Sequence, residues 1–288
     1  MGTATATTTH QPRVDDRDWS ALTPGERIKQ LEVEGYLVLP NLLTPELITQ
    51  LKQEIDDTVT FIPADYSPHQ KGSMNEPFEG PAMIRLLAHS PTITFLKKLF
   101  GPDIVLMHMG VARSEPGHPG ISLHADGQPF GSKIFGFAGS CLFLVRVLYY
   151  LDDLTHDISP FRVIPRSHIC MHEQANPYLR YESHPEEVMV PCKAGSAVLI
   201  NHRVFHGNFP NTGDRPRTMV AIAYRPGWAG PIDKVEPWNP SYVERVPDEA
   251  KPLLGDKNQR VWIPDGDNKP AGMKSEAPGM NPSRWDRC

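Results

Sequence analysis

The sequence predicts an α+β protein that is mainly β, and two observations support this prediction. Helix signals are concentrated before residue 103, whereas runs of β-branched and aromatic residues dominate from residue 103 to about residue 226. The 30 prolines and 22 glycines punctuate the chain without forming a repeat, as expected where turns join short strands. Helices followed by many strands favour a β-sandwich or barrel core with the N-terminal helices packed on it.

The first helix is predicted in the segment TPGERIKQLEVEGY. Thr23 can cap this helix, Pro24 suits its first position, and Glu26 completes a capping box. Gly35 is expected to end the helix. The apolar run YLVLPNLL that follows predicts a short strand.

Two further segments predict helices. TPELITQLKQEIDDTV has a buried stripe at four-residue spacing, formed by Leu47, Leu51 and Ile55. In SPTITFLKKLFG, Ser90 is expected to cap a helix that continues with Pro91 and ends at Gly101. The strands are then expected in the runs DIVLMHMGVAR, SLHAD, CLFLVRVLYYLDD, FRVIP, SAVLINHRVFH and RTMVAIAYRP.

The polar, Thr-rich start predicts a flexible tail over residues 1–18, and residues 19–288 are expected to form a single domain. The core of this domain spans about residues 34–226. An irregular extension over residues 227–288 is too aromatic for a plain disordered tail, so we expect it to wrap the surface.

Composition limits the range of partners. The net charge of -5, with 22% charged residues and no basic tract, argues against nucleic acid. The sequence shows no signal peptide and no membrane span, so we expect no membrane partner. The cysteines lack CxxC spacing and favour reduced thiols in a cytoplasmic setting; they are Cys141, Cys170, Cys192 and Cys288.

The stretch ISLHADGQPFG carries the strongest chemical signal. In an extended strand alternate side chains share a face, so Ser122, His124 and Asp126 would point the same way. One imidazole and one carboxylate then converge, as two ligands of a 2-His-1-carboxylate site for non-haem Fe(II) must do. A third ligand has to come from elsewhere in the chain.

The segment GSAVLINHRVFHGNFPNTGDRPRTMVAIAYRP offers His202 and His206 as that third ligand. A 2-oxoglutarate cosubstrate needs a cation at its distal carboxylate, which the planar guanidinium of arginine provides best. Arg217 lies eleven residues beyond His206, on the strand predicted next, whereas the same offset from His202 reaches Gly213. We therefore prefer His206.

With these residues in place, the sequence resembles the phytanoyl-CoA dioxygenase family of Fe(II)- and 2-oxoglutarate-dependent oxygenases over about residues 34–226. The matching stretches are EGYLVLPNLLTPELITQLKQEI, HAD, YYLDDLTHDISPFRVIPRSH and AGSAVLINHRVFHGNFPN. The resemblance implies a double-stranded β-helix, the jelly-roll or cupin-like fold. It further implies that His124, Asp126 and His206 bind iron and that Arg217 binds the distal carboxylate of 2-oxoglutarate.

The reaction implied by the resemblance is oxidation of a small organic molecule, coupled to decarboxylation of 2-oxoglutarate by O2 to succinate and CO2. Asp126 favours hydroxylation, or desaturation or ring closure by the same oxidant, because related halogenases lack this carboxylate. Asn208 stands where the family often has a hydroxyl, and it can still donate to the cosubstrate. Ser122 is a further candidate cosubstrate contact.

The sequence departs from the family in its middle motif. Ile158 and Ser159 replace an Asn-Gly pair, and Arg166 replaces a glycine. The loop GQPFGSKIFGFAGS suits an apolar lid over the metal, with Phe130, Phe135 and Phe137. Arg162 and Arg166 are candidates for contact with an anionic group of the substrate.

Two alternatives stay open at the level of sequence. SHICMHE can form a zinc site if it is a strand, because one face would then present His168, Cys170 and His172. The chain can also be a non-catalytic, small-molecule-binding protein of the same fold. The sequence leaves the substrate and the oligomeric state open.

Overall fold

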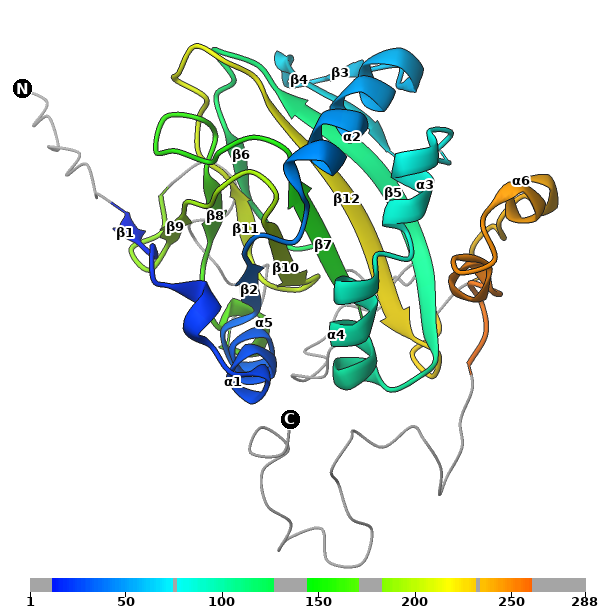
Figure 1. The fold of residues 1–288 in the computed structure, drawn as a ribbon. Helices are drawn as coiled ribbons and strands as arrows, with labels where there is room; N and C mark the ends of the chain where they lie inside the picture. The colour runs from blue at the N-terminus through cyan, green and yellow to red at the C-terminus, as the bar shows by residue number, and fades with distance from the viewer. Residues whose placement is uncertain (1–11, 75–76, 127–143, 171–182, 232–233, 261–288) are drawn as a thin grey trace, which may run out of the picture.

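The fold consists of two β-sheets that face one another, with helices against the larger sheet (Figure 1). The structure is a computed structural model, and it describes residues 12–74, 77–126, 144–170, 183–231 and 234–260. Within these residues the β-rich part of the chain follows the helix-rich part, as the sequence predicts.

The larger sheet has seven strands in the order β2-β10-β7-β12-β5-β4-β3. Their bounds are Tyr36–Leu39, Ala197–Asn201, Val145–Tyr150, Arg217–Pro226, Ile104–Ser114, Ser67–Met74 and Ile62–Ala64. The smaller sheet has five strands in the order β1-β9-β8-β11-β6. Their bounds are Arg13–Val14, Val188–Val190, Phe161–Val163, His206–Asn208 and Ile121–His124.

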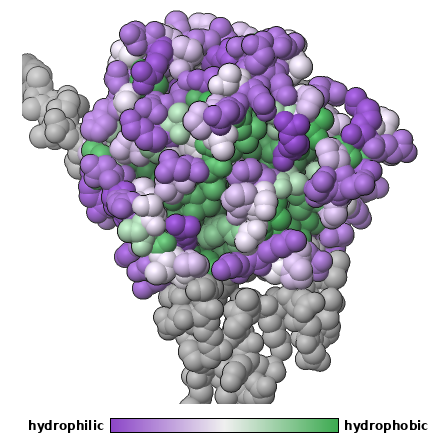
Figure 2. Space-filling view, in the orientation of Figure 1, coloured by the Kyte–Doolittle hydropathy of each residue, from purple (hydrophilic) through white to green (hydrophobic). Residues whose placement is uncertain are grey.

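The helices lie mainly in the N-terminal part of the chain. They are η1 (Trp19–Ala21), α1 (Pro24–Lys29), η2 (Gln30–Glu34), α2 (Pro45–Thr58), α3 (Pro81–Leu86), α4 (Ser90–Phe100), α5 (Ser167–Cys170), α6 (Pro240–Arg245) and η4 (Lys251–Leu254). Hydrophilic residues cover most of the face on which α2, α3 and α4 lie, and apolar residues gather near its centre (Figure 2). No helix among the described residues is long and apolar enough to cross a bilayer.

The first predicted helix begins where the sequence places it. The Thr23 hydroxyl accepts from the backbone N–H of Glu26 at 3.3 Å, and the Glu26 carboxylate accepts from the N–H of Thr23 at 2.8 Å. This reciprocal pair confirms the capping box. The helix loosens into the π-helical turn η2 and ends at Gly35, whose φ of 86° favours glycine.

The second and third helices confirm most of their predicted features. On α2, Leu51 and Ile55 are completely buried, whereas Leu47 is half-buried near the start of the helix. Helix α4 includes Ser90 as its first residue, so the prediction that Ser90 is the N-cap is wrong. His89 occupies the cap position without a capping side-chain bond, and its Nδ1 instead contacts the Thr92 hydroxyl at 3.1 Å.

Both ends of the described chain are more structured than the sequence predicts. Residues 12–18 are not a flexible tail, because β1 pairs with β9 and the buried Asp15 accepts a hydrogen bond from the Tyr36 hydroxyl at 2.6 Å. The start of the C-terminal extension forms α6 and η4, and their Tyr242 and Leu253 join the main core. The sequence predicted neither the pairing of β1 nor the two C-terminal helices.

Alternate side chains of β12 point to opposite faces of the larger sheet. On the outer face, the Tyr224 hydroxyl donates to the Leu87 carbonyl at 2.8 Å, next to α4. On the inner face, Arg217 contacts Ser159, which lies two residues before the smaller-sheet strand β8. Alternation places further inner-face residues along β12, namely Met219, Ala221 and Ala223. Ala221 and Ala223 each contribute only a methyl group to this face.

Candidate active site

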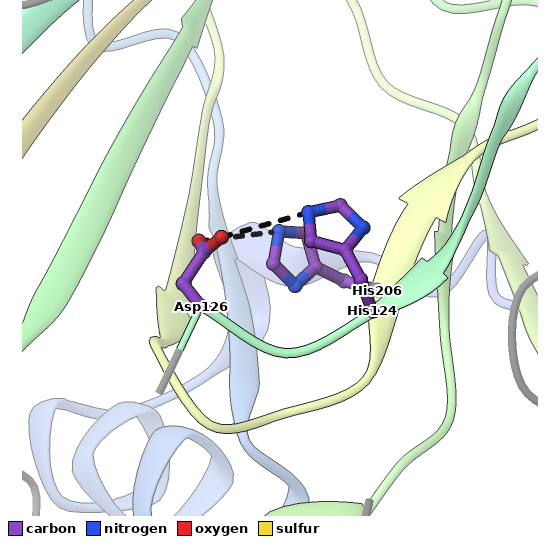
Figure 3. Close-up of side chains that lie close together, drawn as sticks. All are labelled: His124, Asp126 and His206. Atoms are coloured by element: carbon purple, nitrogen blue, oxygen red, sulfur yellow. Dashed lines mark ion pairs between the residues drawn. The ribbon is translucent and has the colours of Figure 1, made fainter. Parts of the chain in front are cut away.

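The candidate metal ligands lie on adjacent strands of the smaller sheet. His124 on β6 and His206 on β11 are direct partners in the antiparallel register, and Asp126 lies two residues beyond the end of β6. The Nε2 atoms of both histidines are 3.5 Å from the Asp126 carboxylate (Figure 3). The ligand atoms of all three residues lie within 4.8 Å of one another, close enough to bind one metal ion.

Backbone carbonyls fix the orientation of both imidazoles. Nδ1 of His124 donates to the carbonyl of Ser122 at 2.9 Å, and Nδ1 of His206 donates to the carbonyl of Val204 at 3.0 Å. Because a carbonyl only accepts, Nδ1 carries a proton in each ring, and Nε2, which faces Asp126, is the atom available to bind a metal. Histidine ligands of metals are commonly oriented by such bonds.

The electrostatics of the three residues suit metal binding. Burial lowers the pKa of His206 to about 4, against the opposing effect of Asp126. Burial alone would raise the pKa of Asp126, but its interactions with His206, His124 and Arg146 together hold it well below its usual range. Burial also disfavours charged His124, yet its hydrogen bond to Asp126 raises its pKa. Asp126 is therefore ionised and His206 neutral near pH 7, as ligands must be.

Arg217 is a buried cation with unused donors. Its side chain has no solvent exposure, and its Nε and Nη1 atoms have no hydrogen-bond partner in the described part of the chain. Its Nη2 donates to the Ser159 hydroxyl at 3.3 Å, and its guanidinium carbon lies 5.5 Å from the centre of the Tyr150 ring. Desolvation lowers the pKa of Arg217, because burial disfavours its charge. An anionic ligand would satisfy both the charge and the free donors.

The structure separates the residues that the sequence offered as alternatives. His202 does not join the three candidate ligands, since its Nδ1 and backbone N–H both donate to the Leu144 carbonyl, at 3.0 and 3.1 Å. Arg215 is exposed in the turn before β12, whereas Arg217 is buried. Of the two histidines, His206 lies beside His124 and Asp126, and Arg217 is the buried arginine on the following strand.

The two further cosubstrate candidates have different positions. Asn208 is buried on β11, and its amide nitrogen donates to the Ser159 carbonyl at 3.3 Å. Ser122 is half-buried and orients His124 through its backbone carbonyl. Asn208 thus lies near Arg217 by way of their shared neighbour, while the recorded contact of Ser122 is with a candidate metal ligand.

Sequence reasoning did not identify two polar residues of the site. Nε of Arg146, on β7, lies 2.8 Å from the Asp126 carboxylate. The Ser159 hydroxyl accepts from Arg217 and from Ser114, the latter at 3.1 Å. The departure from the family's Asn-Gly pair at residues 158–159 marked Ser159 as unusual, but no local pattern marked Arg146.

A chain of buried hydrogen bonds continues behind Ser159. Nδ1 of His118 lies 2.8 Å from the Ser114 hydroxyl, and the half-exposed Tyr66 places its hydroxyl 3.2 Å from Nε2 of His118. Burial, with the charge of Arg217 as the next contribution, lowers the pKa of His118 to about 4. The imidazole is therefore neutral near pH 7, and it links Ser114 to the protein surface.

Three other residues that the sequence singled out have contacts within the protein. Arg162 and Arg166 form ion pairs with Glu187 at 2.7 Å and with Glu34 at 2.6 Å. The segment with His168 is not a strand but the helix α5, in which alternate residues do not share a face.

Some residues of the zinc alternative, but none of the predicted lid, belong to the described part of the chain. His168 uses its Nε2 in a 3.0 Å hydrogen bond with the Glu32 carbonyl, so the described residues give no support to a zinc site there. His172 lies outside the described residues, as does the predicted lid with Phe130, Phe135 and Phe137. Cys170 and Cys192 are free thiols, and the other two cysteines also lie outside the described residues.

Comparison with known proteins decides the family. The sequence profile of the phytanoyl-CoA dioxygenase family (PhyH) matches residues 31–219 of this chain. The chain belongs to this family. Membership confirms the family predicted from sequence and the enzyme class, an Fe(II)- and 2-oxoglutarate-dependent dioxygenase. The dioxygenase trt7 of Aspergillus terreus (strain NIH 2624 / FGSC A1156) is 22% identical over 247 residues, which cover 81% of this chain and 84% of that protein.

Several solved structures have a similar fold. The α-ketoglutarate-dependent epimerase SnoN from nogalamycin biosynthesis superposes with a TM-score of 0.59 at 17% identity, covering 77% of this chain and 92% of that chain. HygX from Streptomyces hygroscopicus, solved with nickel and 2-oxoglutarate, superposes with a TM-score of 0.55 at 17% identity, covering 72% and 88%. These similarities confirm the predicted double-stranded β-helix.

Proposed function

We propose that this dioxygenase oxidises a small organic molecule by hydroxylation, with Fe(II) held by His124, Asp126 and His206 and 2-oxoglutarate held by Arg217. The proposal rests on two groups of residues that are each suited to bind a ligand. One is the convergent set of two imidazoles and a carboxylate, and the other is a fully buried arginine with free donors. The first fits non-haem iron, and the second fits the far carboxylate of the cosubstrate.

The iron supplies the redox chemistry when it is bound: 2-oxoglutarate and O2 give succinate and CO2, and one oxygen atom enters a C–H bond of the substrate. Three ligands from one side leave positions on the other side for cosubstrate and O2. The protein then contributes binding, orientation and exclusion of water.

Each residue has a separate task in this proposal. Arg217 fixes the distal end of 2-oxoglutarate, and its burial makes this charge interaction strong because water cannot screen it. Asn208 supports the same end through the Ser159 backbone. Phe161, stacked with its ring centre 6.1 Å from that of His206, shields the imidazole from water. Arg146 holds the Asp126 carboxylate in place.

The charge of the chain and its free cysteines bear on the substrate class and the cellular setting. We propose a small-molecule substrate rather than nucleic acid, supported by the net charge of -5, and a cytoplasmic setting, supported by the free thiols of Cys170 and Cys192.

A substrate screen tests the function directly. The purified chain is expected to bind one Fe(II) and to release succinate when a candidate small molecule stimulates 2-oxoglutarate turnover. Iron binding without stimulated succinate release by any member of a broad panel would favour the non-catalytic binding protein instead.

A further inference from the structure

A second polar group faces the space between the sheets at the opposite end from Arg217. His108 on β5 is the register partner of Ala223 on β12, and Ala223 is in turn the partner of Arg146 on β7. Directly opposed residues of an antiparallel pair project from the same face, so all three side chains face inward with Arg217. Because strands are about 4.8 Å apart, roughly 10 Å separates the backbones of His108 and Arg146. Ala223, with its single methyl group, is the residue of β12 that lies between them.

His108 is a half-buried polar residue on β5. Both of its ring nitrogens are buried, and neither has a hydrogen-bond partner in the described part of the chain. A buried polar group without a partner is unfavourable and rare in native proteins. Replacement by a leucine of similar size would remove this cost, so a purely structural role does not explain a histidine here.

The protonation state of His108 limits what it can bind. Burial, followed by the charge of Arg146, lowers the pKa of His108 to about 3. The ring is therefore neutral near pH 7 and offers one N–H donor and one nitrogen acceptor. A neutral hydroxyl or carbonyl oxygen matches these atoms better than a phosphate does.

The surroundings of His108 connect it to the candidate metal site. Arg146 lies 2.8 Å from the Asp126 carboxylate, so the inner face around Ala223 lies beside the candidate iron ligands. Apolar residues near Ala223 form a small cluster, namely Val105, Met107, Leu144 and, at its edge, Val235. Most of the surface next to the polar pair is thus hydrophobic.

We propose that His108, together with Arg146 across Ala223, forms a subsite that binds a hydroxyl or carbonyl oxygen of a mainly apolar substrate. This inference rests on the proposed function, because it places the substrate beside the iron. It assigns the substrate class to oxygen-bearing apolar molecules and makes His108 a specificity-determining residue. The subsite fixes the oxygen substituent, and thereby determines which C–H bond lies nearest the metal.

Matched probes with one carbon skeleton test this proposal. The protein is loaded anaerobically with Fe(II) and 2-oxoglutarate, and the visible charge-transfer band is recorded first. Bornane, borneol and camphor are then offered, because they share one rigid apolar skeleton and differ only in carrying no oxygen, a hydroxyl or a carbonyl. Equilibrium dialysis measures the dissociation constant of each.

The wild type is expected to bind borneol and camphor at least about tenfold more tightly than bornane, which is the effect of one buried hydrogen bond. His108→Leu is expected to bind all three probes alike, and His108→Gln, which keeps a donor and an acceptor, is expected to retain part of the preference. The thermal unfolding midpoint of His108→Leu should not fall, because the change removes an unpaired polar group.

Three results overturn the proposal: no oxygen preference in the wild type, no binding of any probe up to its solubility limit, or a preference that survives in His108→Leu. The band recorded before probe addition tests the proposed function separately from the subsite. Its absence from the wild type contradicts the proposed function, whereas its presence without the oxygen preference contradicts only the subsite.

Discussion

The guanidinium of Arg217 rests on the hydroxyl of Ser159, with Nη2 of the arginine 3.3 Å from Oγ of the serine. The same hydroxyl donates to the carbonyl of Phe209 at 3.0 Å. Ser159 has φ of 47°, in the left-handed region that non-glycine residues rarely adopt, and it is completely buried. A serine kept in this unfavourable conformation beside a candidate cosubstrate ligand indicates that its hydroxyl orients Arg217.

Removal of the Ser159 hydroxyl should weaken cosubstrate binding. Ser159→Ala leaves one donor of Arg217 and the Phe209 carbonyl without their partner, so we expect the dissociation constant for 2-oxoglutarate to rise about tenfold. Anaerobic titration of the Fe(II)-loaded protein with 2-oxoglutarate measures this constant. The affinity for Fe(II) itself should stay near that of the wild type.

Ser159→Gly is the matched control, because it also removes the hydroxyl but relieves the backbone. Its free energy of unfolding should exceed that of Ser159→Ala by about 1 kcal/mol, which chemical denaturation measures. Both variants should nevertheless bind 2-oxoglutarate weakly. If both bind it as tightly as the wild type does, Ser159 does not orient Arg217.

Substitution of Arg217 should affect cosubstrate binding far more than substitution of Arg215. Arg217→Ala would leave a buried carboxylate of 2-oxoglutarate unpaired, at a cost of about 2 to 5 kcal/mol. We therefore expect the 2-oxoglutarate requirement to rise at least roughly thirtyfold. Arg215 is exposed, so Arg215→Ala should behave like the wild type. Equal effects of the two substitutions would show that the assignment of Arg217 is wrong.

Iron binding should distinguish the two histidines of the segment before β12. His206→Ala removes one of three ligands and should abolish tight Fe(II) binding in equilibrium dialysis. His202→Ala should keep most of it, because both recorded bonds of His202 go to the Leu144 carbonyl and not to the candidate ligands. Loss of iron from His202→Ala but not from His206→Ala would contradict the proposed ligand set.

The docking of the N-terminal segment predicts a stability effect. The Tyr36 hydroxyl donates to the Asp15 carboxylate at 2.6 Å inside the protein, and Arg17 contacts the same carboxylate at 2.7 Å. Tyr36→Phe should lower the free energy of unfolding by about 1.5 to 3 kcal/mol, the usual range for a hydrogen bond to a charged group. Denaturation with urea measures the change, and an unaltered midpoint would mean that Asp15 does not anchor the segment.

Local sequence signals were sufficient where local interactions determine the structure. Thr23 and Glu26 stand three residues apart and satisfy each other's backbone donors, so the start of α1 can be predicted from four residues. Strand alternation likewise predicts that Arg217 and Ala223 share a face, because the period of two is a property of the strand itself. The spacing from His206 to Arg217 was also readable from the sequence, because it is the length of β11 and the turn that leads into β12.

Contacts between distant residues were not predictable in this way. Arg146 meets Asp126 only because β7 and β6 belong to opposite sheets that face each other, and nothing near Arg146 in the sequence reflects this. The helix α5 stands where the zinc alternative required a strand, since alternating polar residues in a short segment fit either structure. His108 lies within an apolar strand and is distinguished only by its lack of partners.

The most direct test of the central claim is the absorption spectrum of the purified protein with Fe(II) and 2-oxoglutarate in the absence of O2. The account predicts a visible metal-to-ligand charge-transfer band for the wild type, because His124, Asp126 and His206 leave positions on the iron for chelation by 2-oxoglutarate. The same addition to His206→Ala should give no band. Absence of the band from folded, wild-type protein at saturating Fe(II) and 2-oxoglutarate would contradict the account.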